Sequence, residues 1–182
     1  MRVISGSARG HTLAIGSGCD TRPTSDRAKE GLFSVLAPIL RGATFLDLFC
    51  GSGAIGIEAL SRGAESAVFV DNSRKAISAL CANLSKTRMD SKSKVMHMSA
   101  DKAIDLLARD GWRFDVVFMD PPYDSAWIQS TLPAIASSPI LKEDGCIITE
   151  SDSQSDPMET SGLVVDKQKK YGAARFTFYR RG

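Results

Sequence analysis

The tetrapeptide Asp120-Pro121-Pro122-Tyr123 combines residue types that can hold an amine carried on a flat ring. It follows the apolar run at residues 116–119, which is typical of a buried strand. Two consecutive prolines cannot continue a sheet ladder, so we expect the chain to leave the sheet there. A carboxylate and carbonyl oxygens accept hydrogen bonds from an amine, and a tyrosine ring stacks on a planar base. The tetrapeptide therefore predicts a site for the exocyclic amine of a nucleobase.

A second group of residues has the spacing of a nucleotide site. The turn at residues 51–56 reads G-x-G-x-x-G, and Asp71 follows Gly51 by twenty residues, where an acid binds a ribose hydroxyl. Asp47 adds a carboxylate just before the turn. It would repel a pyrophosphate but attract the cationic sulfonium and ammonium of S-adenosylmethionine. This group therefore favours S-adenosylmethionine over NAD, with Gly51 and Gly53 beside the cofactor.

The two groups together predict methyl transfer to an amine. The nitrogen lone pair of a guanine or adenine amine is delocalised into the ring, and accepting its protons on Asp120 and the Pro121 carbonyl would localise it. In-line displacement then needs mainly contact geometry, with nitrogen and methyl carbon roughly 3–3.5 Å apart. We assign the catalytic role to Asp120, Pro121, Pro122 and Tyr123. These residues alone do not distinguish guanine from adenine.

Other polar candidates are weaker. Asp101, just after an expected strand, can either meet an adenine amine or cap a helix together with Ser99. His97 lies in an apolar stretch, and we expect it to pack in the core. The four cysteines are far apart and form no CxxC pair, so neither a metal site nor a disulfide is expected.

Strands that alternate with helices must position these groups. We expect strands at 45–49, 67–71, 94–98, 114–119 and 145–150, and helices ending near Leu60 and spanning 74–85, 101–109 and 125–136, the last broken near Pro133. This alternation predicts an α/β fold with a mostly parallel, doubly wound sheet. Two further strands, 163–171 and 175–179, predict a C-terminal antiparallel hairpin around Gly172.

The N-terminal region differs from the alternating part. Short β-prone pieces around Gly6 and Gly10 predict a small hairpin outside the main sheet. We therefore divide the chain into a β-hairpin appendage at 1–20 and a main domain at 21–182. A helix capped by Thr24 or Ser25 should follow and end near Pro38.

Charge is unevenly distributed along the 182 residues. Residues 1–41 carry six Lys/Arg against three Asp/Glu, residues 42–161 eleven against seventeen, and residues 162–182 six against one. If the two basic ends lie near each other, they can form one phosphate-facing surface. No apolar run reaches the length of a membrane span and no signal-peptide pattern is present, so a cytoplasmic protein is expected.

Several motifs resemble the RsmD family of bacterial 16S rRNA guanine-N2 methyltransferases. The resemblance spans essentially the whole chain. It is carried by the runs Leu46-Asp47-Leu48-Phe49-Cys50-Gly51-Ser52-Gly53, Glu58-Ala59-Leu60-Ser61-Arg62-Gly63-Ala64, Arg22-Pro23-Thr24-Ser25-Asp26-Arg27, Arg2-Val3-Ile4-Ser5-Gly6 with Arg9-Gly10, and Tyr171-Gly172.

The resemblance implies a class I S-adenosylmethionine-dependent methyltransferase with a Rossmann-like fold. It would methylate one guanine of 16S rRNA on the 30S subunit or its assembly intermediate. Nothing in the sequence calls for a metal, a membrane or more than a monomer. The implied cofactor residues are Asp47, Phe49, Gly51, Gly53, Asp71, Asp101, Arg22 and Thr24. If the substrate is RNA, we expect the N-terminal arginines Arg2, Arg9, Arg22 and Arg27 to contact its phosphates.

Three other readings of the chain are open. A DNA adenine-N6 methyltransferase can use the same tetrapeptide, although 182 residues leave little room for a DNA-recognition domain. A non-catalytic RNA-binding module would need neither the acids nor the glycines. An NAD oxidoreductase would need a hydride-site arrangement that the sequence does not show.

Overall fold

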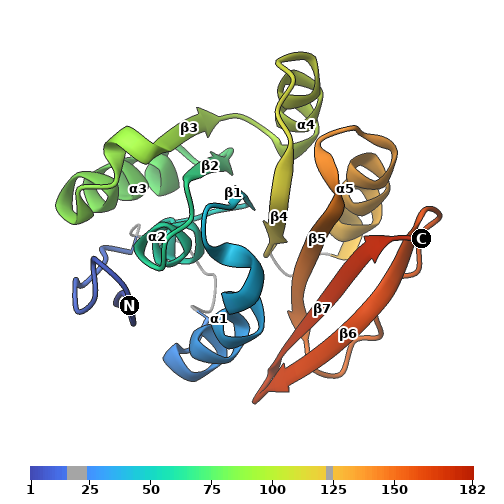
Figure 1. Cartoon of the computed structure of the whole chain (residues 1–182), viewed down its shortest axis with the longest axis horizontal. Coiled ribbons are helices and arrows are strands. Elements are labelled where there is room, and N and C mark those ends of the chain that lie inside the picture. The colour runs from blue at the N-terminus through green and yellow to red at the C-terminus, as the bar shows by residue number, and fades with distance from the viewer. Residues whose placement is uncertain (16–23, 122–124) are drawn as a thin grey trace.

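A seven-stranded sheet in the order β3-β2-β1-β4-β5-β7-β6 runs through the computed structural model (Figure 1). The structure describes residues 1–15, 24–121 and 125–182, without the side chain of Ser125. The strands are β1 Thr44–Leu48, β2 Ser66–Asp71, β3 Ser93–His97, β4 Phe114–Met119, β5 Leu141–Asp152, β6 Leu163–Tyr171 and β7 Ala174–Arg181. The helices are α1 Asp26–Leu40, α2 Ala54–Ser61, α3 Arg74–Thr87, α4 Ala100–Arg109 and α5 Ser125–Ser137, with a 3-10 turn η1 at Asp90–Lys92.

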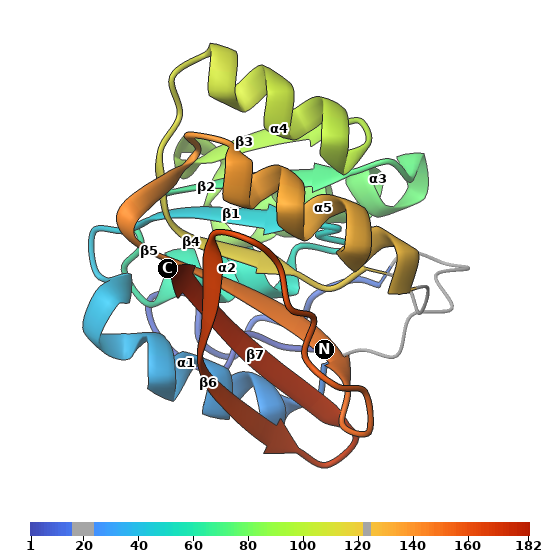
Figure 2. The same cartoon turned by 90° about the vertical axis from the view of Figure 1, so that its right-hand side faces the viewer.

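The sheet is parallel from β3 to β5, and β7 pairs antiparallel with both β5 and β6. Helices α1, α2 and α3 cover one face and α4 and α5 cover the other, as the two views in Figures 1 and 2 show. The strands between these layers are nearly continuous apolar runs because both of their faces are buried. The predicted mostly parallel sheet and the C-terminal antiparallel hairpin are both confirmed.

Alternation along each strand decides which layer a side chain meets. Phe45, Phe118 and Ile148 belong to the core under α1, α2 and α3. Their neighbours in sequence face the core under α4 and α5. We call the first side the α1 face of the sheet. Residues at even steps from these three along β1, β4 and β5 lie on that same face.

Several boundaries differ from the sequence-based prediction. Helix α1 continues through Pro38 to Leu40, and α5 continues unbroken through Pro133. Strand β5 begins at Leu141 rather than 145, because Leu141 pairs with Phe114 across a bulge. It also extends into the expected loop, because Asp152 pairs with Ala174 of β7.

The N-terminal segment forms one antiparallel bridge, between Arg2 and Thr12, and no named strand. It lies outside the main sheet, as predicted, and buries Val3, Ala8 and Leu13 in the core on the α1 face. Its division from the rest of the chain as an appendage stays a prediction, and residues 16–20 lie outside the described part.

His97 is exposed, so the prediction of a core histidine was wrong. It ends β3, the edge strand, where Met96 takes the inward position and His97 points out. One ring nitrogen lies 3.1 Å from the Asn72 carbonyl oxygen. Within the described ranges, no helix has the length and apolar character that crossing a membrane requires.

Candidate active site

A cavity of about 250 Å³ opens at the carboxyl ends of β1, β2 and β4. These are the strands where the chain order reverses, with β2 on one side of β1 and β4 on the other. Open α/β sheets bind ligands at such a switch point. The polar residues that line the cavity are Thr24, Asp47, Ser52, Asp71, Asn72, Ser73, Ser99 and Asp120.

The glycine turn and Asp71 form one unit. The Gly51 N–H donates a 2.9 Å hydrogen bond to Asp71 Oδ2, and the Ser73 N–H donates one of 2.8 Å to Oδ1. Gly53 precedes α2 with φ of 79°, and a Cβ there would meet Leu80 at 2.3 Å. Only glycine fits that position, because both the backbone conformation and the close approach exclude a side chain. The turn and the acid at the end of β2 therefore hold each other in place.

Asp47 is 2% exposed and lies beneath the start of α2. Its Oδ2 accepts a 2.9 Å hydrogen bond from the Gly56 N–H. Burial raises the pKa of Asp47 to about 7, and the nearby Asp71 charge adds to the rise, against the Gly56 hydrogen bond. The carboxyl is thus poised between its two protonation states near neutral pH and would ionise when a cation enters the cavity.

Asp120 and Glu150 stand beside Asp47 on the same face of the sheet. The strands β1, β4 and β5 are adjacent and in register, with Met119 opposite Thr149. Asp47, Asp120 and Glu150 each lie two residues after an α1-face core residue, so all three point to that face. Asp120 and Glu150 continue the register of β4 and β5 side by side, whereas Asp47 lies opposite Phe118, two residues before Asp120.

Burial raises the pKa of Asp120 well above its usual range, and the charges of Glu150 and Asp47 raise it further. Burial also raises the pKa of Glu150. The Thr24 hydroxyl opposes that rise by donating a 2.7 Å hydrogen bond to Glu150 Oε2. Ionisation of Glu150 or Asp47 therefore disfavours ionisation of Asp120, and a cation in the cavity would oppose that effect.

Two aromatic side chains form another wall of the cavity. Phe49 has φ of 61°, a strained value for a bulky residue, and Trp127 lies edge-on to its ring at 6.0 Å between centroids. Trp127 is 38% exposed although it is apolar. Backbone strain of this kind clusters at ligand sites.

Most of the predicted cofactor residues meet here. Asp47, Phe49, Gly51, Asp71 and Thr24 line the cavity, together with Asp120, to which the catalytic role was assigned. Gly53 supports the turn from behind it. Asp101 lies on the exposed first turn of α4, next to Ser99 and Ala100, which do line the cavity, and its hydrogen bond with Ser99 lowers its pKa. Pro121 is buried directly after Asp120. Arg22, Pro122 and Tyr123 lie outside the described residues.

Sequence reasoning missed Glu150, Ser52, Asn72 and Trp127 as site residues. The sequence did contain a pattern that could have identified Glu150, since this residue ends the predicted strand 145–150 at the ligand-binding edge of a parallel sheet. No sequence pattern could have identified Trp127, because its position at the cavity depends on how α5 packs beside Phe49.

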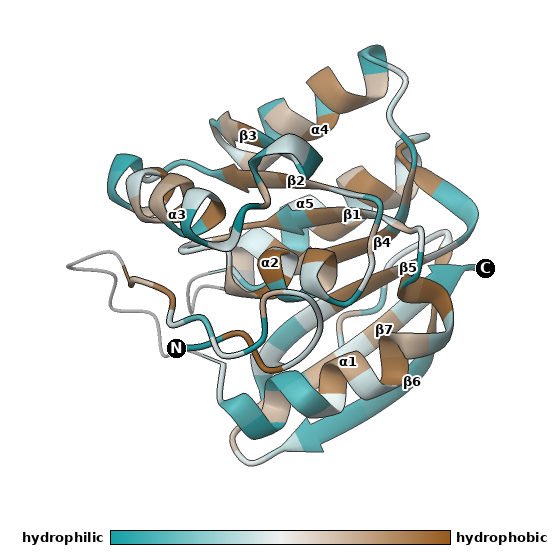
Figure 3. Ribbon diagram, turned by 60° about the vertical axis from the view of Figure 1, so that its left-hand side comes forward, coloured by the Kyte–Doolittle hydropathy of each residue, from teal (hydrophilic) through white to brown (hydrophobic). Residues whose placement is uncertain are grey.

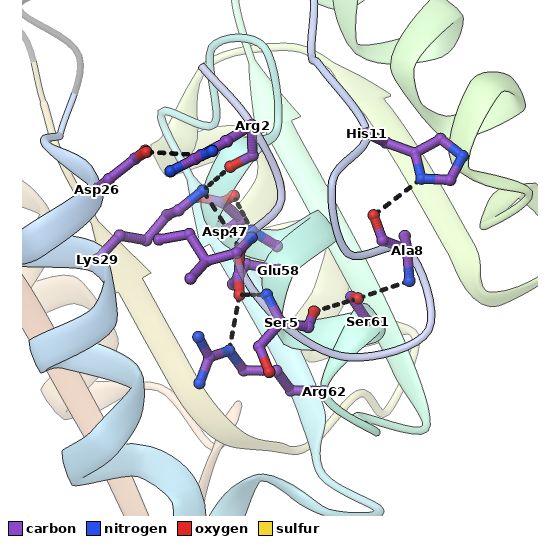
Figure 4. A network of polar contacts seen from close by, with 12 residues as sticks. Arg2, Ser5, Ala8, His11, Asp26, Lys29, Asp47, Glu58, Ser61 and Arg62 are labelled. Carbon is purple, nitrogen blue, oxygen red and sulfur yellow. Dashed lines mark hydrogen bonds and ion pairs between the residues drawn. The ribbon is translucent and has the colours of Figure 1, made fainter.

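The N-terminal segment is attached to α2 by a buried ionic group (Figure 4). The Glu58 carboxylate accepts hydrogen bonds from the Ile4 and Ser5 N–H groups at 2.8 and 3.0 Å. It also pairs with Lys29 at 3.3 Å and with Arg62 at 2.7 Å. Burial lowers the pKa of Lys29, and the Glu58 charge works against that shift. The segment that carries Arg2 is therefore held by charges that would be costly to leave unpaired.

The predicted RNA-binding arginines lie in different places. Arg2 pairs with Asp26 at 3.0 Å, beside the start of α1 and near Met1, which lines the cavity. Arg27 is exposed on the first turn of α1. Arg9 lies in the turn that docks on Ser61, where the Ala8 N–H donates to Ser61 Oγ at 2.9 Å. Because Ser61 ends α2 while the cavity lies at its start, Arg9 is at the far end of that helix.

Comparison with known proteins identifies the family. A family model described as "Conserved hypothetical protein 95" matches residues 1–180. The Bacillus subtilis protein named "Putative rRNA methyltransferase YlbH" is 39% identical over 182 residues, covering all of this chain and 99% of the relative. "Ribosomal RNA small subunit methyltransferase D" of Escherichia coli is 32% identical over 182 residues, covering all of this chain and 90% of the relative. The chain belongs to the RsmD family.

The solved structures agree with that assignment. "Putative methyltransferase yhhF" from Escherichia coli superposes with a TM-score of 0.85 at 32% identity, over all of this chain and 97% of that one. The predicted class I S-adenosylmethionine-dependent methyltransferase fold is therefore confirmed. S-adenosylmethionine is the methyl donor of this enzyme class. The sequence-based preference for S-adenosylmethionine over NAD as the cofactor is therefore confirmed.

Proposed function

We propose that this RsmD-family protein transfers a methyl group to the exocyclic N2 amine of one guanine in 16S rRNA. The observation that carries the proposal is the group of carboxyls on one face of the sheet, Asp47, Asp120 and Glu150, of which Asp47 and Asp120 line the cavity. A row of carboxyl groups suits a site that must hold a cation and an amine together. The relatives named as rRNA methyltransferases support rRNA as the substrate.

The residues present fit S-adenosylmethionine, which supplies the methyl group on a cationic sulfonium. Asp47, Phe49, Gly51 and Thr24 would hold its methionine end, and Asp47 would ionise to balance its charge. Each Asp71 oxygen accepts one backbone hydrogen bond and keeps a lone pair for a ribose hydroxyl. Gly53 would shape the glycine turn. Asp101 and Ser99 would lie beside the adenine of the cofactor, and Arg22 would lie at the mouth of the cavity.

Asp120 and the Pro121 carbonyl oxygen would accept hydrogen bonds from the two N–H groups of the guanine amine. Pro122 and Tyr123 would complete this binding, with the tyrosine ring on the base. The amine nitrogen forms a bond to the methyl carbon as the carbon–sulfur bond breaks, and the sulfur keeps the electron pair of that bond. The nitrogen would then lose one proton, which Asp120 would receive as a carboxylate.

Arg2, Arg9, Arg22 and Arg27 would contact rRNA phosphates, with Arg2 and Arg27 near the cavity. We propose the 30S subunit or its assembly intermediate as the substrate, and a monomer as the acting form. Phosphate contacts of this kind contribute affinity that depends on salt and carry no sequence information.

The test is methyl transfer from labelled S-adenosylmethionine to 30S particles from a strain that lacks the enzyme, followed by nucleoside analysis of the rRNA. We expect label in N2-methylguanosine. Label in N6-methyladenosine of DNA substrates would favour the adenine methyltransferase reading instead. Cofactor binding without any transfer to 30S particles, their intermediates or bare rRNA would favour the non-catalytic RNA-binding reading.

A further inference from the structure

The C-terminal hairpin reaches the same edge of the sheet as the cavity. Strand β6 runs parallel to β5, since each pairs antiparallel with β7, so the turn after Tyr171 lies at the carboxyl edge of the parallel strands. Register places Glu150 opposite Phe176, and Phe176 opposite Lys169. Lys169 is therefore two strand spacings, roughly 10 Å, from Glu150.

Lys169 lies on the α1 face of the hairpin. Phe176, its partner in β7, and Tyr171, two residues along β6, both pack with the core on that face. Side chains of paired residues point to the same side of a sheet, so Lys169 points there too. Lys170 pairs with Arg175 and points to the opposite face.

Tyr171 fixes the hairpin tip against α1. A Cβ on Gly31 would lie 2.2 Å from the Tyr171 ring, so the ring occupies the space that the glycine leaves. The same ring packs on Phe176 with centroids 6.0 Å apart. Residues far apart in sequence are thereby held at one fixed spacing, and α1 and the end of β6 lie side by side in Figure 3.

Arg27 completes the arrangement. It precedes Gly31 by four residues, so both lie on the helix face that meets Tyr171, with Arg27 one turn nearer the start of α1. Arg27 and Lys169 are both exposed, and within the described residues neither has an ion-pair partner. Arg2 and Lys167, by contrast, pair with Asp26 and Asp166. In Figure 3 the ribbon has the hydrophilic colour over this end of β6 and the first turn of α1.

We infer that Arg27 and Lys169, held together by Tyr171 on Gly31, form a phosphate-binding strip that tracks the RNA backbone beside the cavity. We call these two residues the basic strip. The inference rests on the proposed function for its partner, an RNA strand, and adds a C-terminal contact to the predicted N-terminal ones. Two unpaired cations at the edge where the base must enter match the charge of successive phosphates.

The test measures binding of 30S particles that lack the modification to wild-type protein and to Lys169→Ala, Arg27→Ala and the double variant, at 50–200 mM KCl. The matched control is Lys170→Ala, which removes the same charge from the neighbouring residue on the other face. Each strip substitution should weaken binding roughly five- to tenfold near 0.1 M salt, and should reduce the salt slope by about 0.7–0.9.

The affinity for S-adenosylmethionine should stay unchanged in every variant, because none of these side chains lines the cavity. An unchanged salt slope in the double variant, or an equal loss in Lys170→Ala, overturns the basic strip. Methylation by the wild-type protein is measured separately. If the wild-type protein methylates 30S particles but the strip variants bind them as tightly as the wild type does, only this inference fails. If the strip variants weaken binding but the wild-type protein does not methylate, only the proposed reaction fails.

Discussion

The Thr24 hydroxyl donates a 2.7 Å hydrogen bond to the Glu150 carboxylate, and so joins the segment before α1 to the end of β5. Thr24 lines the cavity, and Glu150 stands next to Asp120 across the β4–β5 pair. The contact therefore ties the segment before α1 to the neighbour of Asp120, the carboxyl group proposed to receive the amine. The proposed chemistry of Asp120 should respond to changes in Glu150.

Glu150→Gln should move the acidic limb of the pH–rate profile to lower pH. After burial, the Glu150 charge is the largest cause that raises the pKa of Asp120, and the amide removes it while keeping an acceptor for Thr24. Asp120 would then ionise at lower pH. Turnover of 30S particles measured from pH 5 to 9 checks this. A profile identical to that of the wild type would show that the two carboxyls do not interact.

Thr24→Val should raise the pKa of Glu150 itself. It removes the hydrogen bond that holds the pKa of Glu150 down, so Glu150 should become protonated at higher pH than in the wild type. Thr24→Ser keeps the hydroxyl and is the matched control. The Glu150 carboxyl resonance followed by NMR through a pH titration reports the shift directly, and equal titration curves for Val and Ser would contradict the prediction.

Asp120→Ala should separate cofactor binding from turnover. Its proposed role is toward the substrate amine, so turnover should fall by roughly 10²–10³-fold, the usual cost of losing a group that acts in the transition state. Affinity for S-adenosylmethionine, measured by calorimetry, should change little. Asp120→Asn keeps one acceptor oxygen and should lose less turnover. Equal losses of binding and turnover would assign Asp120 to the cofactor instead.

The sequence predicted most of what local patterns determine. The apolar run ended by Pro121 defined β4 correctly, and the G-x-G-x-x-G spacing located the turn that Asp71 holds. The pairing of Glu150 with Thr24 spans 126 residues and depends on strand register, which no local pattern reports. The early start of β5 was hidden for a related reason, because exposed charged residues follow Leu141 and resemble a loop.

For the two basic ends of the chain, too, the sequence predicted the residue types but not their positions in the fold. Composition predicted that both termini carry cations, but their placement depends on packing. Gly31 gave no sign in the sequence that Tyr171 would lie against it. Arg9, grouped with Arg2 by sequence, lies at the other end of α2.

Arg9→Glu should therefore weaken binding of 30S particles less than Arg27→Glu does. A larger loss of binding in Arg9→Glu would show that the RNA passes near Ser61 instead.

Gly31→Ala should destabilise the protein, although the same change in an ordinary helix stabilises by up to about 1 kcal/mol. The new methyl group would overlap the Tyr171 ring, and overpacking of this kind costs about 1–3 kcal/mol. Ser34→Ala, an exposed site on the same helix, is the control. Urea unfolding measures both, and a more stable Gly31→Ala protein would show that the ring moves away freely.

The stability of the ligand-free protein should depend on pH through Asp47. Unfolded, this carboxyl ionises near pH 4, but in the folded protein burial keeps it protonated up to a pKa of about 7. The folded state therefore binds more protons between these values, so the free energy of unfolding falls as the pH rises from about 4 to about 7, and the effect of Asp47 is constant above that.

Asp47→Asn should flatten this part of the curve. At roughly 1.4 kcal/mol per pKa unit, the loss over the window is a few kcal/mol at most, and the raised pKa values of Asp120 and Glu150 leave a residual slope of the same sign. Urea unfolding of both proteins at pH 4.5, 6 and 8 tests the prediction. Parallel stability curves for the two proteins would show that Asp47 is ionised throughout.

The same carboxyl should make cofactor affinity depend on pH. In the wild type, S-adenosylmethionine should bind more tightly as the pH rises through 7, since its cation favours the ionised carboxylate.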